Sequence, residues 1–422
     1  MRFLFETLGC RCNQSETAAM ESLLRARGHS IVTENADVVV LNGCAVTAES
    51  ARKSRQAARR LLKQNPGAKL AVCGCWPQAE PGEAEDCHPA VIGGSGGRLA
   101  FVAALCALEA DVPPVNLLDR ALERRTFEAL PPDRSLGRTR AYLKVEDGCV
   151  NFCAYCIIPF LRGPVRSLPP EQAVKEALRL RDAGVKELIL TGIELASYQY
   201  GLGDLAAALG RAAPELRLRL GSLEPRVVDG DLCEKLRGVP KLCPHFHLSL
   251  QSGCDDTLRR MGRKYDTARF RLSVELLRAA FPGCALTADL ITGFPGETEE
   301  EFSRTLDFLR ECAFAHVHVF PYSERKGTKA ASLPDSVPKG EREERARRAI
   351  ALAAESRAAF LAAQVGTVQE VLFESRLGRT PNDCETELLP GAEGQILPAE
   401  ITGVRNGRLT LRALSGMPEA KG

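Results

Sequence analysis

Short β-rich runs alternate with helical stretches along most of this chain, and that alternation restricts the possible folds more than any other feature. Over residues 1 to about 110, the runs RFLFETL, ADVVVLN and KLAVC are separated by stretches such as TAESARKSRQAARRLLKQ. Strands that alternate with helices build parallel sheets, because each parallel connection needs a long crossover. We therefore predict an α/β fold that begins with a doubly wound parallel-sheet domain over residues 1–125.

A second alternating series follows residues 111–140, a stretch containing VPP and LPPD that is typical of a linker. Helical stretches such as PPEQAVKEALRLRDAG separate its six β-rich runs, which are AYLKVE, ELILTG, RLRLGSL, HFHLSLQ, ALTADLITG and AHVHVFPY. Six strand-and-helix units predict a partial (β/α)6 parallel barrel, which we assign to residues 135–345.

The composition changes again after the charged helical stretch KGEREERARRAIALAAESRAAFLAA. Short strands such as TVQEVLFE and RLTLRAL follow, and Asn406 with Gly407 marks a hairpin turn. We expect a small closed β-barrel over residues 365–418.

Length, charge and cysteine content narrow the class of protein. The chain has 422 residues and a net charge of +2, so its overall charge neither requires nor excludes a polyanionic partner. No apolar run approaches the roughly 18 residues of a membrane span, and the start MRFLFETLGC lacks the pattern of a signal peptide. We therefore expect a cytoplasmic protein with no membrane partner. In a reducing compartment, metal binding or catalysis explains its 16 cysteines better than disulfides do.

Three cysteines occur together in GCVNFCAYCIIP, where Cys149, Cys153 and Cys156 are separated by four and three positions. Three thiolates do not complete a structural zinc site without a remote ligand, and the nearest histidines are His88 and His245. A 4Fe-4S cluster on three cysteines instead leaves one iron open to an exogenous ligand. The motif follows the run AYLKVEDG, at the end of the strand where parallel barrels carry their sites. In this context the trio resembles the radical S-adenosylmethionine superfamily.

Three further cysteines, Cys10, Cys44 and Cys75, each follow a glycine at the expected end of a strand in the N-terminal domain. The carboxyl ends of parallel strands converge on one edge of a sheet, where such folds bind ligands. A glycine before each thiol lets the backbone approach a bulky group. We expect this trio to hold a second 4Fe-4S cluster. Cys12 and Cys73 are alternative ligands, because each lies two residues from a member of the trio.

Two three-cysteine sites on two α/β domains, followed by a small β-barrel, resemble the methylthiotransferase family over nearly the whole chain. The matching segments are TLGCRCNQSE, LNGCAVTAESARKSR, YLKVEDGCVNFCAYCIIP, CPHFHLSLQSG and LITGFPGET. TLGCRCNQ, AESARKSR, LCPHFHLSLQSG and VFPYSERKGT are most similar to the branch that acts on threonylcarbamoyladenosine in tRNA. The chain departs from the usual family residues at Cys12, Gly43 and Trp76.

This resemblance implies an enzyme that inserts a methylthio group at carbon 2 of threonylcarbamoyladenosine beside the anticodon of tRNA. Replacing a non-acidic aromatic C–H bond is beyond any side-chain base, so the reaction needs radical chemistry from its cofactors. The implied cofactors are S-adenosylmethionine and two 4Fe-4S clusters. The implied partners are the tRNA anticodon arm, a reductant of flavodoxin or ferredoxin type and an unidentified sulfur donor, and the implied C-terminal module is a TRAM domain, an RNA-binding β-barrel.

Three other functions remain open at this point. The chain could methylthiolate isopentenyladenosine in tRNA or an aspartate of a ribosomal protein, which are the substrates of other branches of the family. A non-catalytic iron–sulfur redox sensor would also explain two three-cysteine sites.

Contacts to S-adenosylmethionine are expected at the carboxyl ends of the barrel strands and inside the cysteine loop. Each residue at these positions has an ordinary alternative as a helix cap or turn residue. The candidates are Tyr155, Thr191, Gly192, Glu194, Ser222, Glu224 and Gln251.

Basic residues at three- and four-residue steps predict one site of contact with tRNA phosphates, although a solvated helix face is the alternative. They are Arg52, Arg55, Arg59 and Lys63, and a second basic group comprises Arg259, Arg260, Arg263 and Lys264. A threonylcarbamoyl group carries a carboxylate, so its pocket needs a cation. Arg325 and Lys326, after the sixth strand, are the candidates for that cation.

Overall fold

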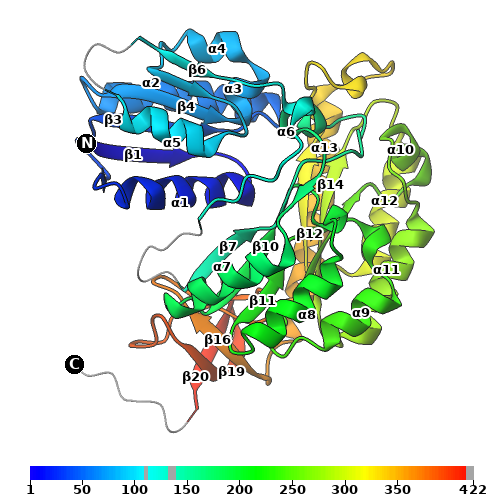
Figure 1. The fold of residues 1–422 in the computed structure, drawn as a ribbon. Helices are drawn as coiled ribbons and strands as arrows, with labels where there is room; N and C mark the ends of the chain where they lie inside the picture. The colour runs from blue at the N-terminus through cyan, green and yellow to red at the C-terminus, as the bar shows by residue number, and fades with distance from the viewer. Residues whose placement is uncertain (109–112, 132–138, 415–422) are drawn as a thin grey trace.

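The computed structural model describes residues 1–108, 113–131 and 139–414, which form three consecutive parts of the chain (Figure 1). The blue N-terminal part lies at one end of the central parallel strands, and the orange and red C-terminal part lies at the other. The expected linker at 111–140 and the expected domain end at 418 fall partly outside the described residues. Among the described residues, no helix is both long and apolar enough to cross a membrane.

The N-terminal part is a six-stranded parallel sheet in the order β2-β1-β3-β4-β5-β6. Its strands are β1 (Arg2–Thr7), β2 (Ser30–Ile31), β3 (Val38–Gly43), β4 (Lys69–Gly74), β5 (Val91–Gly93) and β6 (Val115–Leu117). Every residue of β3 is buried, because helices cover both faces of the sheet.

Apolar side chains on alternate positions of these strands point to opposite faces of the sheet. Val40 packs with helices α1 (Arg11–Arg25) and α5 (Arg98–Cys106) on one face. Leu41 packs with α2 (Ala48–Gln64), α3 (Cys75–Ala79) and α4 (Pro81–Glu85) on the other. This arrangement confirms the predicted doubly wound sheet.

The central part contains six parallel strands in one curved series. β11 leads directly into β12, and this joins the sheet β11-β10-β7 to the sheet β12-β13-β14-β15. The strands are β7 (Arg140–Lys144), β10 (Glu187–Thr191), β11 (Arg217–Leu220) with β12 (Ser222–Leu223), β13 (His245–Gln251), β14 (Ala285–Thr292) and β15 (His316–Pro321). The series matches all six predicted runs and forms the predicted partial barrel.

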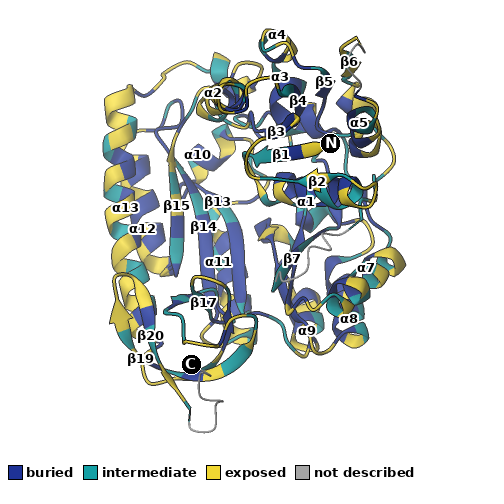
Figure 2. Ribbon diagram, turned by 90° about the vertical axis from the view of Figure 1, so that its left-hand side faces the viewer, coloured by how far each residue is buried: buried dark blue, intermediate teal, exposed yellow. Residues whose placement is uncertain are grey.

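Helices cover the outside of this partial barrel. They are α7 (Pro170–Asp182), α8 (Leu202–Ala212), α9 (Gly230–Arg237), α10 (Asp255–Arg260), α11 (Thr267–Ala280) and α12 (Glu299–Cys312). A short helix α6 (Ile158–Arg162) and the short strands β8 (Glu146–Asp147) and β9 (Arg166–Ser167) flank the cysteine loop. Figure 2 shows β13 and β14 deeply buried, whereas α12 and α13 (Lys339–Ala362) expose much of their outer surface.

The C-terminal part is a closed barrel in the order β16-β17-β18-β20-β19, as predicted. Its strands are β16 (Val368–Phe373), β17 (Gly378–Arg379), β18 (Glu385–Thr386), β19 (Ile396–Arg405) and β20 (Arg408–Ala413). Asn406 and Gly407 connect β19 to β20 with φ angles of 51° and 73°, so the predicted hairpin turn is confirmed. Single 3-10 turns occur at η1 (Ala121–Glu123), η2 (Leu195–Ser197), η3 (Pro225–Val227) and η4 (Lys329–Ser332).

A buried ion network joins the N-terminal sheet domain to the central barrel. Glu16 on α1 lies 2.7 Å from Arg98 Nη2 and 2.7 Å from Lys144 Nζ, and it also pairs with Arg162. Burial alone would raise the pKa of the Glu16 carboxyl, but the charges of these cations hold it well below its usual range. The network fixes α1 against the carboxyl end of β7.

The C-terminal barrel packs at the amino ends of the central strands. Its residue Asp383 lies 3.6 Å from Arg219 Nη1 and 3.7 Å from Arg140 Nη2, both on strands of the central part. The two outer parts therefore enclose the interior of the central barrel from opposite ends.

Candidate active site

Cys10, Cys44 and Cys75 follow the neighbouring strands β1, β3 and β4, so they lie along one edge of the N-terminal sheet. Gly9 and Gly74 turn the chain at two of these strand ends with φ angles of 107° and 101°. A Cβ on Gly9 would lie 3.1 Å from the Cys44 sulfur, and a Cβ on Gly74 would lie 2.4 Å from a backbone oxygen of β3. Glycine at these positions therefore lets the strand ends approach one another.

The three thiols influence one another electrostatically. Burial raises the pKa of Cys75 to about 11, and the charges of Cys44 and Cys10 add to this shift. The guanidinium of Arg162 acts in the opposite direction on all three thiols. Three neighbouring sulfurs beside a buried cation fit the negative charge of an iron cluster held by thiolates.

The two alternative ligands lie in different surroundings. Cys73 packs in the apolar cluster beside α1 and α5, whereas Cys75 packs in the cluster on the other face of the sheet. Cys12 lies within reach of Cys10, and their hydrogen bond lowers the pKa of Cys10 to about 6. Cys12 Sγ also lies 3.9 Å from Thr191 Oγ1 at the end of β10. Cys12 therefore stays an alternative to Cys10, while Cys73 faces away from the trio.

Cys149, Cys153 and Cys156 lie in the loop between β8 and α6. Two donors point at their sulfurs: the N–H of Asn151 lies 3.5 Å from Cys149 Sγ, and Arg263 Nη1 lies 3.2 Å from Cys153 Sγ. Burial raises the pKa of Cys156 to about 12 and that of Cys149 to about 11. All 16 cysteines are free thiols. Three free thiols with donors aimed at their sulfurs fit a cluster that leaves one iron open.

The two trios meet where the N-terminal domain contacts the cysteine loop. Ile157 directly follows Cys156, and it packs in the same apolar cluster as Cys75 and Trp76. Trp76 is fully buried in that cluster, which makes it a core residue. The close packing brings both trios to the interface between the two domains.

Three of the candidates for binding S-adenosylmethionine, Thr191, Gly192 and Ser222, face a common cavity. Glycine is required at position 192, because a Cβ there would lie 2.6 Å from Glu146 Oε2. Burial raises the pKa of Glu194 to about 7, and its carboxylate accepts a hydrogen bond from Asn151 Nδ2 at 3.3 Å. These residues place polar groups directly beside the Cys149 loop.

The remaining candidates have clear structural partners. Glu224 pairs with Arg226 at 2.9 Å. Tyr155 packs edge-on against Phe294, with ring centroids 6.4 Å apart. Gln251 has a φ of 66° and lies where the register of β13 and β14 shifts.

A cavity of about 600 Å³ extends between the three parts of the chain. The N-terminal domain contributes Cys10, Arg11 and Cys12, and the C-terminal barrel contributes residues such as Arg379 and Asp383. Of the six proposed cluster ligands, Cys10 lines this cavity, while Cys149 lines a separate cavity of about 350 Å³. The main cavity therefore joins one cysteine trio to the strand ends beside the other.

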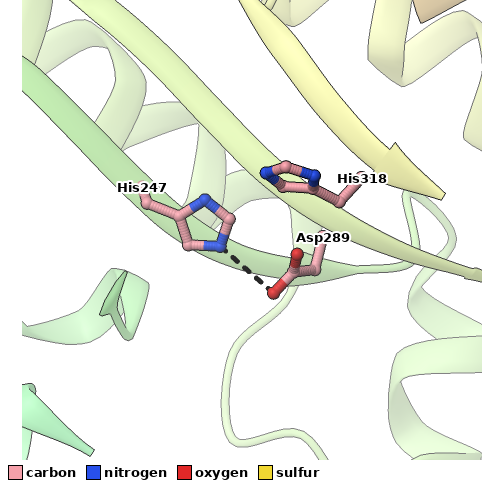
Figure 3. A group of neighbouring side chains, drawn as sticks. All are labelled: His247, Asp289 and His318. Carbon is pink, nitrogen blue, oxygen red and sulfur yellow. Dashed lines mark hydrogen bonds and ion pairs between the residues drawn. The ribbon is translucent and has the colours of Figure 1, made fainter. Parts of the chain in front are cut away.

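His247, Asp289 and His318 project toward one another from the neighbouring strands β13, β14 and β15 (Figure 3). Their nitrogen and oxygen atoms lie within 4.8 Å of one another, and this combination of ligands suits several divalent metals. However, His247 Nε2 lies 3.1 Å from Asp289 Oδ2, and its Nδ1 lies 2.9 Å from Thr287 Oγ1. Both ring nitrogens of His247 already have hydrogen-bond partners, so we interpret the group as a polar wall of the cavity.

The predicted basic residues on α2 lie on its accessible side. Arg52 pairs with Glu49 and Arg55 pairs with Glu83, each at 2.6 Å. Arg59 and Lys63 are exposed, and neither has an ion pair with another described residue. Half of the predicted stripe is therefore neutralised by neighbouring carboxylates.

The two cations predicted to bind a substrate carboxylate lie away from the cavity. Arg325 is buried, and its Nη2 lies 2.8 Å from Glu80 Oε1 in the N-terminal domain. Lys326 is exposed. Neither residue lines the 600 Å³ cavity, so other cations have to meet a carboxylate bound there.

Sequence reasoning missed three residues that organise the site. Arg162 contacts Asn13 and Glu16, and Arg263, which was predicted to lie in an RNA-binding group, instead points at Cys153. Glu146 accepts a hydrogen bond from the Glu194 N–H at 2.7 Å, and burial raises its pKa to about 9. Their partners are distant in sequence, and the one local signal is that Glu146 and Arg162 flank the cysteine motif.

Comparisons with known proteins agree with this division of the chain. The profile of the Radical SAM superfamily matches residues 143–309, and that of the Uncharacterized protein family UPF0004 matches residues 2–93. Each matched range contains one of the two cysteine trios.

Two curated relatives from Bacillus subtilis cover most of the chain. The threonylcarbamoyladenosine tRNA methylthiotransferase is 37% identical over 388 residues, which are 90% of this chain and 86% of that protein. The tRNA-2-methylthio-N(6)-dimethylallyladenosine synthase is 35% identical over 399 residues, which are 90% of this chain and 77% of that protein.

Among solved structures, the radical S-adenosylmethionine methyltransferase TsrM from Kitasatospora setae has a similar fold. It superposes with a TM-score of 0.54 at 15% sequence identity, over 76% of this chain and 74% of that one. This similarity supports the α/β architecture of the chain.

Proposed function

This chain belongs to the tRNA methylthiotransferase family of radical S-adenosylmethionine enzymes, and we propose that it inserts a methylthio group at carbon 2 of threonylcarbamoyladenosine beside the anticodon of tRNA. Enzymes of this family use S-adenosylmethionine and two 4Fe-4S clusters. Relatives named for threonylcarbamoyladenosine reach 37% identity, and those named for dimethylallyladenosine reach 35%. This small difference makes the cavity the better guide to the substrate.

We propose that Cys149, Cys153 and Cys156 hold the cluster that binds S-adenosylmethionine, and that Cys10, Cys44 and Cys75 hold the second cluster. Free thiols in both trios, donors aimed at the sulfurs of Cys149 and Cys153, and an arginine beside each trio support this assignment. When bound, these groups supply the radical that breaks an aromatic C–H bond and the sulfur that replaces the hydrogen.

The cavity of about 600 Å³ is the observation that carries the proposal. Cys10 bounds it on one side, and the strand-end residues Thr191, Gly192 and Ser222 bound it on another. A base that enters this cavity would lie between Cys10 and the strand ends next to the Cys149 loop. Holding the reacting groups together in this way removes the entropic barrier of a collision between them.

The chain's own residues orient the cosubstrate and exclude water. The Glu146 carboxyl accepts the N–H of Glu194 and contacts Gly192, which fixes the loop after β10. Glu194 then presents a carboxylate beside the Cys149 loop, where it could accept a hydrogen bond from the amino group of S-adenosylmethionine. The buried network around Glu16 seals the domain interface against solvent.

Polar groups in the cavity favour threonylcarbamoyladenosine over isopentenyladenosine. Histidines, carboxylates and arginines make up much of the lining, whereas its apolar side chains include only alanines and Phe360 besides the cysteines. An isopentenyl group is wholly apolar and would leave these groups without hydrogen bonds. A threonylcarbamoyl group offers a carboxylate, a hydroxyl and amide groups to them.

The proposal also includes the tRNA, the reductant and the sulfur donor. The tRNA anticodon arm would contact exposed basic residues of α2, including Arg59 and Lys63, and the C-terminal barrel, which resembles a TRAM domain. A reductant of flavodoxin or ferredoxin type and a separate sulfur donor would support repeated turnover. Replacing Arg59 and Lys63 with glutamine should reduce the slope of log affinity against log salt by about one for each phosphate that the variant no longer binds.

The tRNA nucleoside profile of a strain that lacks this chain tests the proposed function. We expect 2-methylthio-threonylcarbamoyladenosine to disappear and to return with the wild-type chain, but not with Cys153→Ala. Loss of the methylthio-isopentenyladenosine signal instead would assign the other tRNA branch. An unchanged tRNA profile would point to a ribosomal-protein aspartate or to a redox sensor.

A further inference from the structure

Three arginines line the 600 Å³ cavity, and they differ in how their charge is balanced. Arg379 lies 2.9 Å from Glu385 and 3.6 Å from Asp383, so neighbouring carboxylates neutralise it. The guanidinium groups of Arg11 and Arg357 have no hydrogen bond or ion pair with any residue that the structure describes. Both side chains are only partly accessible.

The carboxylates that line the cavity form no ion pair with Arg11 or Arg357. Asp289 is paired with His247 at 3.1 Å. Asp383 lies 3.6 Å from Arg219 and 3.7 Å from Arg140, which stand outside the lining. Glu385, paired with Arg379, also lies 3.3 Å from Arg408. Asp383 and Glu385 already have arginine partners, and Asp289 hydrogen-bonds His247 and forms no ion pair with either arginine, so the charges of Arg11 and Arg357 stay available to an anion that enters the cavity.

Arg11 and Arg357 converge on the same part of the cavity although they come from α1 and α13. The charges of both arginines lower the pKa of His318, after the larger effect of burial. His318 lies on β15 and faces Asp289 and His247 (Figure 3). Its ring nitrogens form no hydrogen bond with a described residue. Two unpaired guanidinium groups and a free imidazole therefore surround one region of the cavity.

Such an arrangement is suited to a carboxylate. A guanidinium group binds a carboxylate through two parallel hydrogen bonds, and the pair is strongest in a site shielded from water. A partly buried cation without a counter-ion loses hydration and gains nothing in return, so a site of this kind is stabilised when an anion enters. The imidazole of His318 adds a group that can exchange a hydrogen bond with a hydroxyl.

We propose that Arg11 and Arg357 bind the carboxylate of the substrate's threonylcarbamoyl group and that His318 hydrogen-bonds its hydroxyl. This inference rests on the proposed function and identifies the residues that select the substrate. Arg11 directly follows Cys10, a proposed cluster ligand, so the same turn of α1 would contact both the reactive sulfur site and the substrate's side arm. An isopentenyl group would leave both arginines unpaired, which gives the site selectivity against it.

Two other anionic groups could bind the same arginines, and the test distinguishes them from the threonylcarbamoyl carboxylate. The methionine carboxylate of S-adenosylmethionine is one, and a tRNA phosphate is the other. If either were the ligand, the arginines would affect binding of S-adenosylmethionine or of unmodified RNA. If the threonylcarbamoyl group is the ligand, they affect only RNA that carries its negative charge.

The experiment compares anticodon stem-loops that carry threonylcarbamoyladenosine, its neutral carboxamide analogue or unmodified adenosine. Affinities and methylthiolation rates are measured with the cluster-loaded wild type and with Arg11→Gln, Arg357→Gln and the double variant. Iron content and S-adenosylmethionine affinity are recorded for every variant. Arg25→Gln on α1 and Arg347→Gln on α13 are matched controls, because both are surface residues outside the cavity lining.

We expect the wild type to bind RNA with the threonylcarbamoyl acid more tightly than RNA with the carboxamide. In each arginine variant the ratio of these two affinities should be about 10- to 100-fold smaller. Binding of unmodified RNA and of S-adenosylmethionine should not change, and the two controls should match the wild type. Variants that keep the full preference for the acid would overturn the inference while leaving the proposed function intact. A wild type that acts on isopentenyladenosine and not on threonylcarbamoyladenosine would overturn the proposed function and this inference together.

Discussion

The two cysteine trios reach similar chemistry through opposite structural routes. Cys149, Cys153 and Cys156 occupy one short loop between β8 and α6. Cys10, Cys44 and Cys75 are brought together only by the order of β1, β3 and β4 in the sheet. The loop trio is therefore determined by local sequence, whereas the sheet trio depends on the tertiary fold of a whole domain.

The arginines beside the trios, buried Arg162 and half-buried Arg263, differ in the same way. Arg263 donates directly to Cys153 Sγ at 3.2 Å, so it acts on one sulfur of the loop trio. Arg162 is held by Glu16 and Asn13 of α1, and its charge reaches all three thiols of the sheet trio. Arg263 therefore contacts a single cluster ligand, whereas Arg162 belongs to a network that also holds two domains together. Each difference leads to a measurable contrast.

The largest contrast is between removing one trio and removing the other. Replacing all three cysteines of either trio with alanine should abolish methylthiolation and halve the iron content from about eight to about four per chain. The variant without Cys10, Cys44 and Cys75 should still release 5′-deoxyadenosine from S-adenosylmethionine on reduction, whereas the variant without the loop trio should not. Anaerobic reconstitution followed by iron analysis and chromatography of the products makes the comparison. If the variant that lacks the loop trio released 5′-deoxyadenosine, the sheet trio and not the loop trio would hold the cluster that cleaves S-adenosylmethionine.

The next contrast concerns stability. Glu16→Gln removes the carboxylate that Arg98 pairs with and leaves Lys144 and Arg162 with Asp147, so we expect a loss of about 3–5 kcal/mol in the free energy of unfolding. Iron should also be lost first from the sheet trio. Denaturant unfolding and iron retention measure both effects.

A matched substitution in the same domain serves as the control for that experiment. Glu6→Gln removes the partner of Arg60 in an accessible ion pair, which should change stability by about 0–1 kcal/mol. If Glu6→Gln and Glu16→Gln destabilise the protein equally, the buried network does not have the role assigned to it.

A smaller contrast is expected in the reduction potentials. Arg263→Gln removes a positive charge and a hydrogen bond from the sulfur of Cys153, and both stabilise the more negative, reduced cluster. The potential of the loop cluster should therefore become more negative, while that of the sheet cluster stays constant. A redox titration followed by electron paramagnetic resonance resolves the two. Equal shifts in both clusters would argue against a local effect.

The last contrast is a dependence of stability on pH at Glu146. Burial raises its pKa to about 9 from the ordinary value of 4.5, so between these values the folded chain holds a proton that the unfolded chain releases. Its contribution therefore lowers stability as pH rises through that window. Glu146→Gln cannot ionise and still accepts the N–H of Glu194, so its stability should decline less with pH. The exposed Glu393→Gln is the control, and identical slopes in both variants would refute this role for Glu146.

Much of the fold was predictable because it depends on local periodicity. The six central runs, the doubly wound sheet and the Asn406–Gly407 turn were all inferred from patterns that one segment carries by itself. The third central strand is divided into β11, which belongs to one sheet, and β12, which belongs to the other. This division was not predictable, since it depends on the curvature of the whole barrel.

Side-chain partners were the least predictable part of the site. Arg263 and Arg325 have the same charge in the sequence, yet one points at a cysteine and the other pairs with Glu80 of another domain. Arg11 lies beside a predicted ligand, but its free guanidinium becomes evident only when the cavity wall is assembled from α1, α13 and the central strands. The spacing of cysteines along the chain is enough to predict which of them bind a cluster. The partners of charged side chains depend on the complete fold.

The central claim is that both trios bind clusters and lie close enough to act on one substrate. The most direct measurement is the electron paramagnetic resonance spectrum of the fully reduced, cluster-loaded protein, compared with the sum of the spectra of the two variants that each lack one trio. The account predicts a spectrum broadened or split by magnetic coupling between neighbouring clusters. A spectrum equal to that sum, from protein that contains about eight irons per chain, would contradict it.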